Sequence, residues 1–241
     1  MIKIITDSGC GIGLELAKKL NIEVIKIPLI VDEVVYDNDL PIGFETVLNY
    51  MKEDKEIQTS QISPLTFKTI FEREVEQGNE VIYISISSKL SGTYNSALLA
   101  KSMIEKEEKI AIIDSLNVLM GQALLVENAV TMVKEGLSLI DIVESLEKNK
   151  RKVKQYAMVD TLDYLLKRGR ISKSQYVIGN ILQMKIILTS NEGELIVETK
   201  VRGTNKARKW LEEKYFSDKD NIDFSKSLSI CYREDKDIEL K

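Results

Sequence analysis

The sequence predicts an α/β fold, with a mainly parallel α/β domain followed by a smaller α+β domain. Short β-branched and aromatic runs alternate with helix-like segments before residue 150, which is typical of a parallel sheet covered by helices. A basic, weakly apolar run at 148–154 then interrupts the alternation. Beyond it, two apolar runs flank Asn191-Glu192-Gly193, a pattern that favours an antiparallel hairpin. We therefore expect domains at residues 1–152 and 153–241.

Each element of the first domain follows from its local pattern. Apolar, β-branched runs predict strands at 2–5, 24–31, 81–86 and 110–113. Helix-like spacing predicts helices at 13–20, 43–52, 64–78, 93–106, 120–135 and 138–150. Ser63-Pro64 indicates a helix start, because serine caps the first turn and proline fits into it. Pro28 indicates an edge or a bend in its strand, because proline cannot donate to a sheet.

The second domain alternates shorter elements. Local patterns predict strands at 156–159, 186–189, 195–201 and 227–232, a short helix ending near Lys167, and helices at 176–182 and 205–215. We interpret the apolar side chains at 178–188 as ordinary core rather than as the wall of a ligand tunnel. The sequence shows no internal repeat and no low-complexity tract.

Composition excludes several classes of function. The net charge of −4 argues against non-specific nucleic-acid binding, which needs a basic face. No apolar run is long enough to span a membrane, and no basic segment precedes the first apolar run. Cys10 and Cys231 have neither redox-motif nor metal-ligand spacing, so we expect a cytoplasmic protein. The chain has no histidine, which excludes a Ser-His-Asp triad and a His-ligated metal within it. We expect no metal and no cofactor.

The most informative stretch is residues 81–97, where an apolar strand is followed by a hydroxyl-rich loop and a helix start. The first N–H groups of a helix lack internal partners and favour an anion. Gly92 would let the backbone approach such a ligand closely. The alternative interpretation, which the residues leave open, is that Ser91 or Thr93 only caps the helix.

Similar polar segments follow other predicted strands. They are Thr6-Asp7-Ser8, Ser87-Ser88 and Asp114-Ser115, with Thr59-Ser60-Gln61 just before a helix. In open α/β sheets the carboxyl ends of the strands share one edge, where ligands bind. We therefore expect these loops to converge on one site, in which Asp7 and Asp114 orient hydroxyls rather than catalyse.

Together these segments resemble the DegV family, which includes the fatty-acid-binding, FakB-like subunits of bacterial fatty acid kinase. The resembling segments are Thr6-Asp7-Ser8, Thr59-Ser60-Gln61 with Ser63-Pro64, residues 87–97, Asp114-Ser115, Met120-Gly121, residues 160–172 and Val201-Arg202-Gly203. They occur in the family's order and cover nearly the whole chain. The resemblance implies a two-domain protein that holds a long-chain fatty acid between its domains.

The resemblance also implies residue roles. The family's carboxylate-binding threonine falls on Thr59, beside Ser60, and its carboxylate-binding serine falls on Ser91, with the amides of Gly92 and Thr93 close by. The arginines of the surface that the kinase uses fall on Arg170 and Arg202. Family members continue with a histidine-containing segment that helps to hold the head group. This sequence lacks it, so we expect residues 153–241 to form a shortened domain.

The resulting hypothesis is a lipid-binding carrier without enzymatic activity. It would present a fatty acid to a separate fatty acid kinase for acyl-phosphate formation and phospholipid metabolism. Two alternatives stay open. One is a small phosphoryl-transfer or hydrolytic enzyme that uses Asp7 or Asp114 on a phosphorylated or carboxylated small molecule. The other is a shortened relative that binds no lipid.

Overall fold

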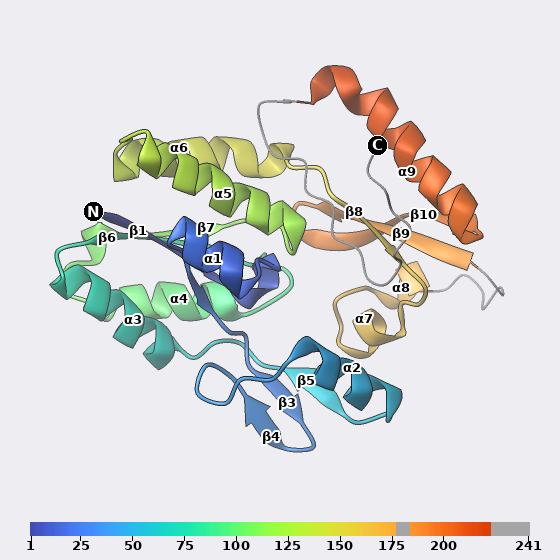
Figure 1. The fold of residues 1–241 in the computed structure, drawn as a ribbon, viewed down its shortest axis with the longest axis horizontal. Coiled ribbons are helices and arrows are strands. Elements are labelled where there is room, and N and C mark those ends of the chain that lie inside the picture. Colours follow the sequence, from blue (N-terminus) through green and yellow to red (C-terminus); the bar gives the residue numbers. More distant parts are fainter. Residues whose placement is uncertain (177–183, 223–241) are drawn as a thin grey trace.

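The computed structural model describes residues 1–176 and 184–222 of the chain (Figure 1). Its first sheet is four-stranded and entirely parallel, in the order β2-β1-β6-β7. The strands are β1 (Ile2–Asp7), β2 (Glu23–Ile25), β6 (Glu80–Ser85) and β7 (Ile110–Asp114). The helices around it are α1 (Leu14–Leu20), α3 (Pro64–Glu76), α4 (Thr93–Lys101), α5 (Met120–Lys134) and α6 (Leu139–Asn149). The predicted parallel α/β architecture is confirmed.

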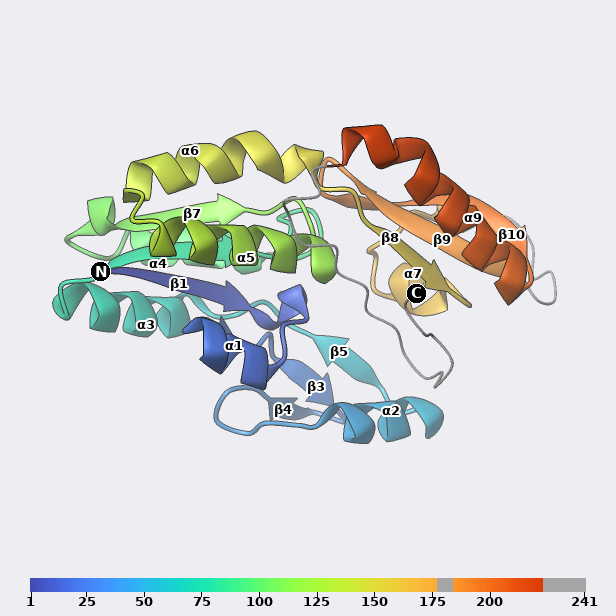
Figure 2. The same cartoon turned by 45° about the horizontal axis from the view of Figure 1, so that its top comes forward.

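Alternate residues of the central strands supply two separate apolar cores. Ile4 and Ile82 point to one face, where they pack with residues of α1, α5 and α6. Ile5 and Tyr83 point to the other face, where they pack with Phe67 and other residues of α3 and α4. Because both faces are covered, consecutive residues such as Ile4-Ile5 and Val81 to Ile84 are apolar rather than alternating with polar ones. Figures 1 and 2 show the sheet between its two helical layers.

A second, smaller sheet was not predicted. Strands β3 (Leu29–Val31), β4 (Val34–Tyr36) and β5 (Ile57–Thr59) form it in the antiparallel order β4-β3-β5, next to α2 (Phe44–Lys52). The predicted strand at 24–31 is therefore wrong as one element, because it divides around Pro28 into β2 and β3 of different sheets. Thr59 ends a strand opposite Leu29 rather than lying in a loop.

The second half of the chain forms an antiparallel sheet, as expected. Its order is β10-β9-β8, from β8 (Tyr156–Val159), β9 (Met184–Asn191) and β10 (Glu194–Arg202). The helices are α7 (Asp163–Lys167), α8 (Lys173–Tyr176) and α9 (Thr204–Asp218), with α9 lying along the sheet (Figure 2). The rings of Tyr156 and Trp210 meet edge to face at 5.8 Å between centroids.

Most predicted boundaries hold to within a few residues, with one clear exception. The helix predicted at 93–106 ends at Lys101. Ser63 and Ser138 cap α3 and α6 through their hydroxyls, as expected. The predicted strand at 227–232, and the predicted helix at 176–182 apart from its first residue, lie outside the described residues. The division between residues 152 and 153 remains a prediction.

Candidate functional site

The segment that follows β5 and the loop before α4 are in direct contact. The Ile62 N–H donates a buried hydrogen bond to Thr93 Oγ1 at 3.3 Å. The Gln61 side chain lies so close to Gly92 that a Cβ atom there would come within 2.0 Å of Gln61 Oε1. A side chain at position 92 would have to displace the end of the Gln61 side chain. The chain thus brings together two predicted site segments that are some thirty residues apart in sequence.

We call Thr59, Ser60, Ser91, Gly92 and Thr93 the hydroxyl cup. Within it, Ser91 Oγ donates to Thr93 Oγ1 at 2.9 Å and accepts from the Thr93 N–H at 3.2 Å. Ser91 therefore does part of the work of a helix cap, since Gly92 offers no side chain at the N-cap position of α4. Across residues 1–176 and 184–222, the hydroxyls of Thr59 and Ser60 and the N–H of Gly92 have no hydrogen-bond partner. A helix cap accounts for Ser91 and Thr93 but not for the three unpaired donors of Thr59, Ser60 and Gly92.

The carboxyl end of β1 forms a second polar group, which we call the Asp7 cluster: Thr6, Asp7, Tyr83 and Gln122. All four residues are fully buried. The carboxylate of Asp7 accepts from Tyr83 Oη at 2.7 Å, Gln122 Nε2 at 3.2 Å and the N–H groups of Ile86 and Gly9 at 2.8 and 2.9 Å. Thr6 Oγ1 donates to the Ile84 carbonyl and accepts from Gln122. Every acceptor site of the carboxylate is thus used internally.

Burial raises the pKa of Asp7 above its usual value, although the bonds from Tyr83, Ile86, Gln122 and Gly9 act in the opposite direction. The neighbouring Cys10 is also buried, and desolvation raises the pKa of its thiol to about 11. A neutral thiol is a poor nucleophile. Both groups are fully buried, so neither is accessible to a substrate in this structure.

The remaining supporting loops are also engaged within the fold. Ser8 Oγ accepts from the Ile27 N–H at 3.0 Å, and Asp114 Oδ1 accepts from the Ser88 N–H at 3.1 Å. Ser115 Oγ donates to the Asn117 carbonyl at 3.0 Å. Ser87 Oγ donates at 2.7 Å to the Gly193 carbonyl at the tip of the β9–β10 hairpin. These loops shape the edge of the sheet and hold the second half of the chain against it.

Comparison with known proteins decides the family. Residues 1–238 match the sequence profile described as "Uncharacterised protein, DegV family". The chain belongs to the DegV family. A similar relative is the DegV domain-containing protein TTE1491 of Caldanaerobacter subterraneus subsp. tengcongensis. It is 36% identical over 233 residues, which are 97% of this chain and 79% of that protein.

Two solved structures of fatty-acid-binding proteins have a similar fold. One is a fat acid (stearic acid)-binding protein from Eubacterium ventriosum, with a TM-score of 0.83 and 28% identity over 92% of this chain and 78% of that one. The other is DegV, a fatty acid binding protein from Bacillus subtilis, with a TM-score of 0.77 and 29% identity over 91% of this chain and 77% of that one. The resemblance inferred from the ordered motifs is confirmed.

The two predicted partner-binding arginines of this DegV family member differ in their surroundings. Arg170 Nε donates to the Leu90 carbonyl at 2.7 Å, and its Nη1 donates to the Arg168 carbonyl. Arg202 is exposed at the end of β10. Within the described part of the chain its side chain has no hydrogen bond or ion pair. Both residues are exposed, but of the two only Arg202 has a guanidinium without a partner among the described residues.

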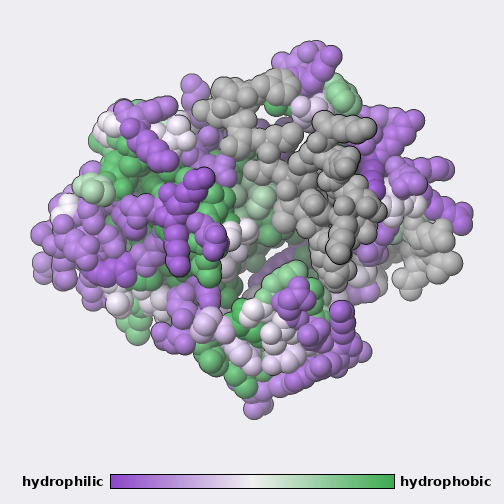
Figure 3. Space-filling model, viewed as in Figure 1, coloured by the Kyte–Doolittle hydropathy of each residue, from purple (hydrophilic) through white to green (hydrophobic). Residues whose placement is uncertain are grey.

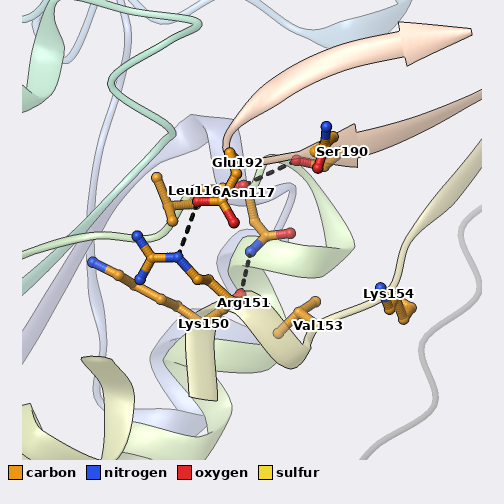
Figure 4. Close-up of a pocket in the computed structure, with 9 residues that line it drawn as sticks. Leu116, Asn117, Lys150, Arg151, Val153, Lys154, Ser190 and Glu192 are labelled. Carbon is orange, nitrogen blue, oxygen red and sulfur yellow. Dashed lines mark hydrogen bonds and ion pairs between the residues drawn. The ribbon is translucent and has the colours of Figure 1, made fainter. Parts of the chain in front are cut away.

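A small cavity lies where the two halves meet, away from the hydroxyl cup. It measures about 130 Å³ and is lined by Asn117, Lys150, Arg151, Lys154, Ser190 and Glu192, among others. Figure 4 shows how Ser190 and Glu192 of the hairpin reach Leu116 and Arg151 of the first half. Ligand pockets typically enclose about 300–1,000 Å³ and are mainly apolar. This polar cavity is therefore too small for a long acyl chain.

Sequence reasoning missed two members of the Asp7 cluster, Tyr83 and Gln122. Tyr83 was assigned only to a strand, although its hydroxyl needs a partner when buried. Gln122 is a single polar residue between Gly121 and Ala123 on a buried helix face. An isolated buried amide of this kind signals a polar partner inside the fold, and this signal was available in the sequence.

Within residues 1–176 and 184–222, no group of three or more histidine, cysteine, aspartate or glutamate side chains could hold a metal ion. No helix of those segments combines the length and the apolar character that a membrane crossing needs.

Proposed function

We propose that this protein binds a long-chain fatty acid and presents it to a separate ATP-dependent kinase, without an activity of its own. The observation that carries the proposal is the hydroxyl cup, where Thr59, Ser60 and Gly92 offer donors that the described residues leave unused. The structurally similar fatty-acid-binding proteins from Eubacterium ventriosum and Bacillus subtilis support the class of ligand.

The cup fits the needs of a carboxylate. A carboxylate that leaves water loses its hydration and needs donors in exchange. The Thr59 and Ser60 hydroxyls and the Gly92 N–H would supply them, and the Ser91 hydroxyl would join them by turning from Thr93 Oγ1 to the carboxylate. Each charge-assisted hydrogen bond contributes roughly 1.5–3 kcal/mol. The dipole of α4 favours the same negative charge. The proposed role of these groups is to orient the acid.

The hydrocarbon tail would supply most of the affinity. Each buried methylene contributes about 0.8 kcal/mol, so a long chain yields on the order of 10 kcal/mol before ordering costs. Figure 3 shows apolar residues on both sides of a recess between the lobe of β3, β4, β5 and α2 and the body of the protein. Leu14 of α1 and Phe44 of α2 are each 65% exposed. Such exposed apolar surface favours an apolar ligand.

Presentation to a kinase requires the acidic end of the lipid to stay near the surface. The cup meets this requirement, since Thr59 is exposed and Ser91 is half-buried. We assign Arg202 to the kinase-docking surface because it is exposed and its guanidinium has no partner among the described residues. After phosphorylation the acyl-phosphate would leave for phospholipid synthesis in the cytoplasm.

Native mass spectrometry of the purified protein tests the proposal. We expect a co-purified fatty acid that organic extraction releases and that added fatty acid replaces. With an ATP-dependent fatty acid kinase, the loaded protein should yield acyl-phosphate. The Thr59→Ala, Ser91→Ala double variant should still bind lipid but yield far less product. Turnover of a phosphoester by the protein alone would instead support an enzyme, and failure to bind any fatty acid would contradict the proposal.

A further inference from the structure

We propose that Arg168 and Arg170 form a clamp that sets the spacing between the two halves of the hydroxyl cup. The inference rests on the proposed function, because it concerns the same site. It assigns to Arg168 a positioning role, and it gives Arg170 a role inside the fold. Neither side chain need touch the lipid for the clamp to act.

The clamp reaches one backbone carbonyl on each side of the cup. An Arg168 Nη2–H donates to the Ile57 carbonyl of β5, two residues before Thr59. Arg170 Nε donates at 2.7 Å to the Leu90 carbonyl, directly before Ser91. Arg170 also donates through Nη1 to the Arg168 carbonyl, which joins the two arms. One turn of the chain thus holds both of the segments that carry the carboxylate-binding hydroxyls.

The turn itself is firmly anchored. It follows α7, and Gly169 adopts a left-handed φ of 68° that favours glycine. The N–H groups of Gly169 and Arg170 bond to the Leu166 and Leu165 carbonyls at 2.9 and 2.8 Å, as in a helix C-terminal motif. Ile171, next in the chain, is only 5% exposed in the core of the second half. The arginines therefore extend from a rigid support.

Arginine suits this task better than lysine. Its planar guanidinium carries five donors in a fixed fork and stays charged at every relevant pH. Both arms of the clamp end on carbonyl oxygens, which accept from such a fork without compensating its charge. The positive charge beside the cup also favours a carboxylate over a neutral head group. Thr59 ends a strand and Ser91 lies in a loop, and the clamp adds to the contacts that the following residues Gln61 and Ile62 make with Gly92 and Thr93.

The test compares a fatty acid with the fatty alcohol of the same chain length, by displacement of a fluorescent fatty acid. The ratio of the two dissociation constants measures the cup, because both ligands share the tail. In Arg168→Met, which keeps the aliphatic stem but removes every donor, we expect the preference for the acid to fall about tenfold. The affinity for the alcohol should stay nearly constant. Arg168→Lys should restore part of the preference.

Lys167→Met is the matched control, since Lys167 is exposed in the same turn and has no partner among the described residues. It should leave the ratio unchanged.

Equal losses for the acid and the alcohol in Arg168→Met would overturn the clamp and leave only a structural role. So would an unchanged ratio. If the unsubstituted protein binds both ligands equally well, the carboxylate cup itself fails and the clamp fails with it. If Arg168→Met does not fold, Arg168→Lys carries the test: a ratio equal to that of the unsubstituted protein would overturn the clamp.

Discussion

The Asp7 cluster and the hydroxyl cup lie at the ends of neighbouring elements, yet they use their polar groups in opposite ways. Asp7 accepts hydrogen bonds from four donors and is fully buried. In the cup, the Thr59 hydroxyl and the Gly92 N–H have no partner among the described residues. The difference shows that position at a sheet edge does not by itself make a polar side chain part of a ligand site. A saturated group stabilises the fold, whereas unused donors are available to a ligand.

The largest effect should come from damage to the saturated cluster. In Asp7→Asn the new amide would place a donor against the Tyr83 hydroxyl or the Ile86 N–H, so we expect a loss of about 3 kcal/mol in the free energy of unfolding. Urea unfolding measures it. The folded fraction should keep its affinity for fatty acid. Lost binding with little lost stability would reverse the roles assigned to the two groups.

A smaller loss of stability is expected at Thr93, the cup residue whose hydroxyl already accepts a hydrogen bond from the Ile62 N–H. Thr93→Val keeps the shape of the side chain but leaves the Ile62 N–H without its acceptor. We expect it to cost about 1–2 kcal/mol of stability and to weaken the binding of acid more than that of alcohol. Thermal melts and the displacement assay measure the two losses. A variant as stable as the parent would show that the contact between the two segments is not needed.

The Ser63 cap of α3 lies outside both the Asp7 cluster and the hydroxyl cup, so its removal should affect stability alone. Ser63 Oγ accepts from the Thr66 N–H at 3.1 Å at the start of α3. Ser63→Ala should lower the free energy of unfolding by about 1 kcal/mol and leave the preference for acid over alcohol unchanged. The same two assays apply. A change in that preference would extend the cup to the end of α3.

The smallest expected effect concerns pH. Because burial raises the pKa of Asp7, the native state binds this proton more tightly than the unfolded chain does. The raised pKa of Asp7 therefore contributes stability that is fully present below the pKa of an unfolded aspartate. This contribution is lost as the pH rises through the native pKa of Asp7. The difference in unfolding free energy between the parent and Asp7→Asn, measured across acidic pH, isolates this term from the other carboxyl groups. A difference independent of pH would contradict the raised pKa.

Local features were predictable, and long-range partners were not. The hydroxyl caps of Ser63 and Ser138 follow from three-residue patterns and are confirmed. The division of residues 24–31 between two sheets depends on pairings with distant strands, which no local pattern encodes. Tyr83 and Gln122 reach Asp7 from positions 76 and 115 residues away. The same reasoning explains why Gln61 against Gly92 was not foreseen.

The central claim is that the cup grips an ionised carboxylate, and carbon NMR of a carboxyl-¹³C fatty acid tests it most directly. Donors that bind the charged form lower a carboxyl pKa. We predict that the bound acid stays ionised between about pH 5 and pH 8 in the unsubstituted protein. In the Thr59→Ala, Ser91→Ala double variant it should instead titrate within that range. The same titration curve in both proteins would contradict the account.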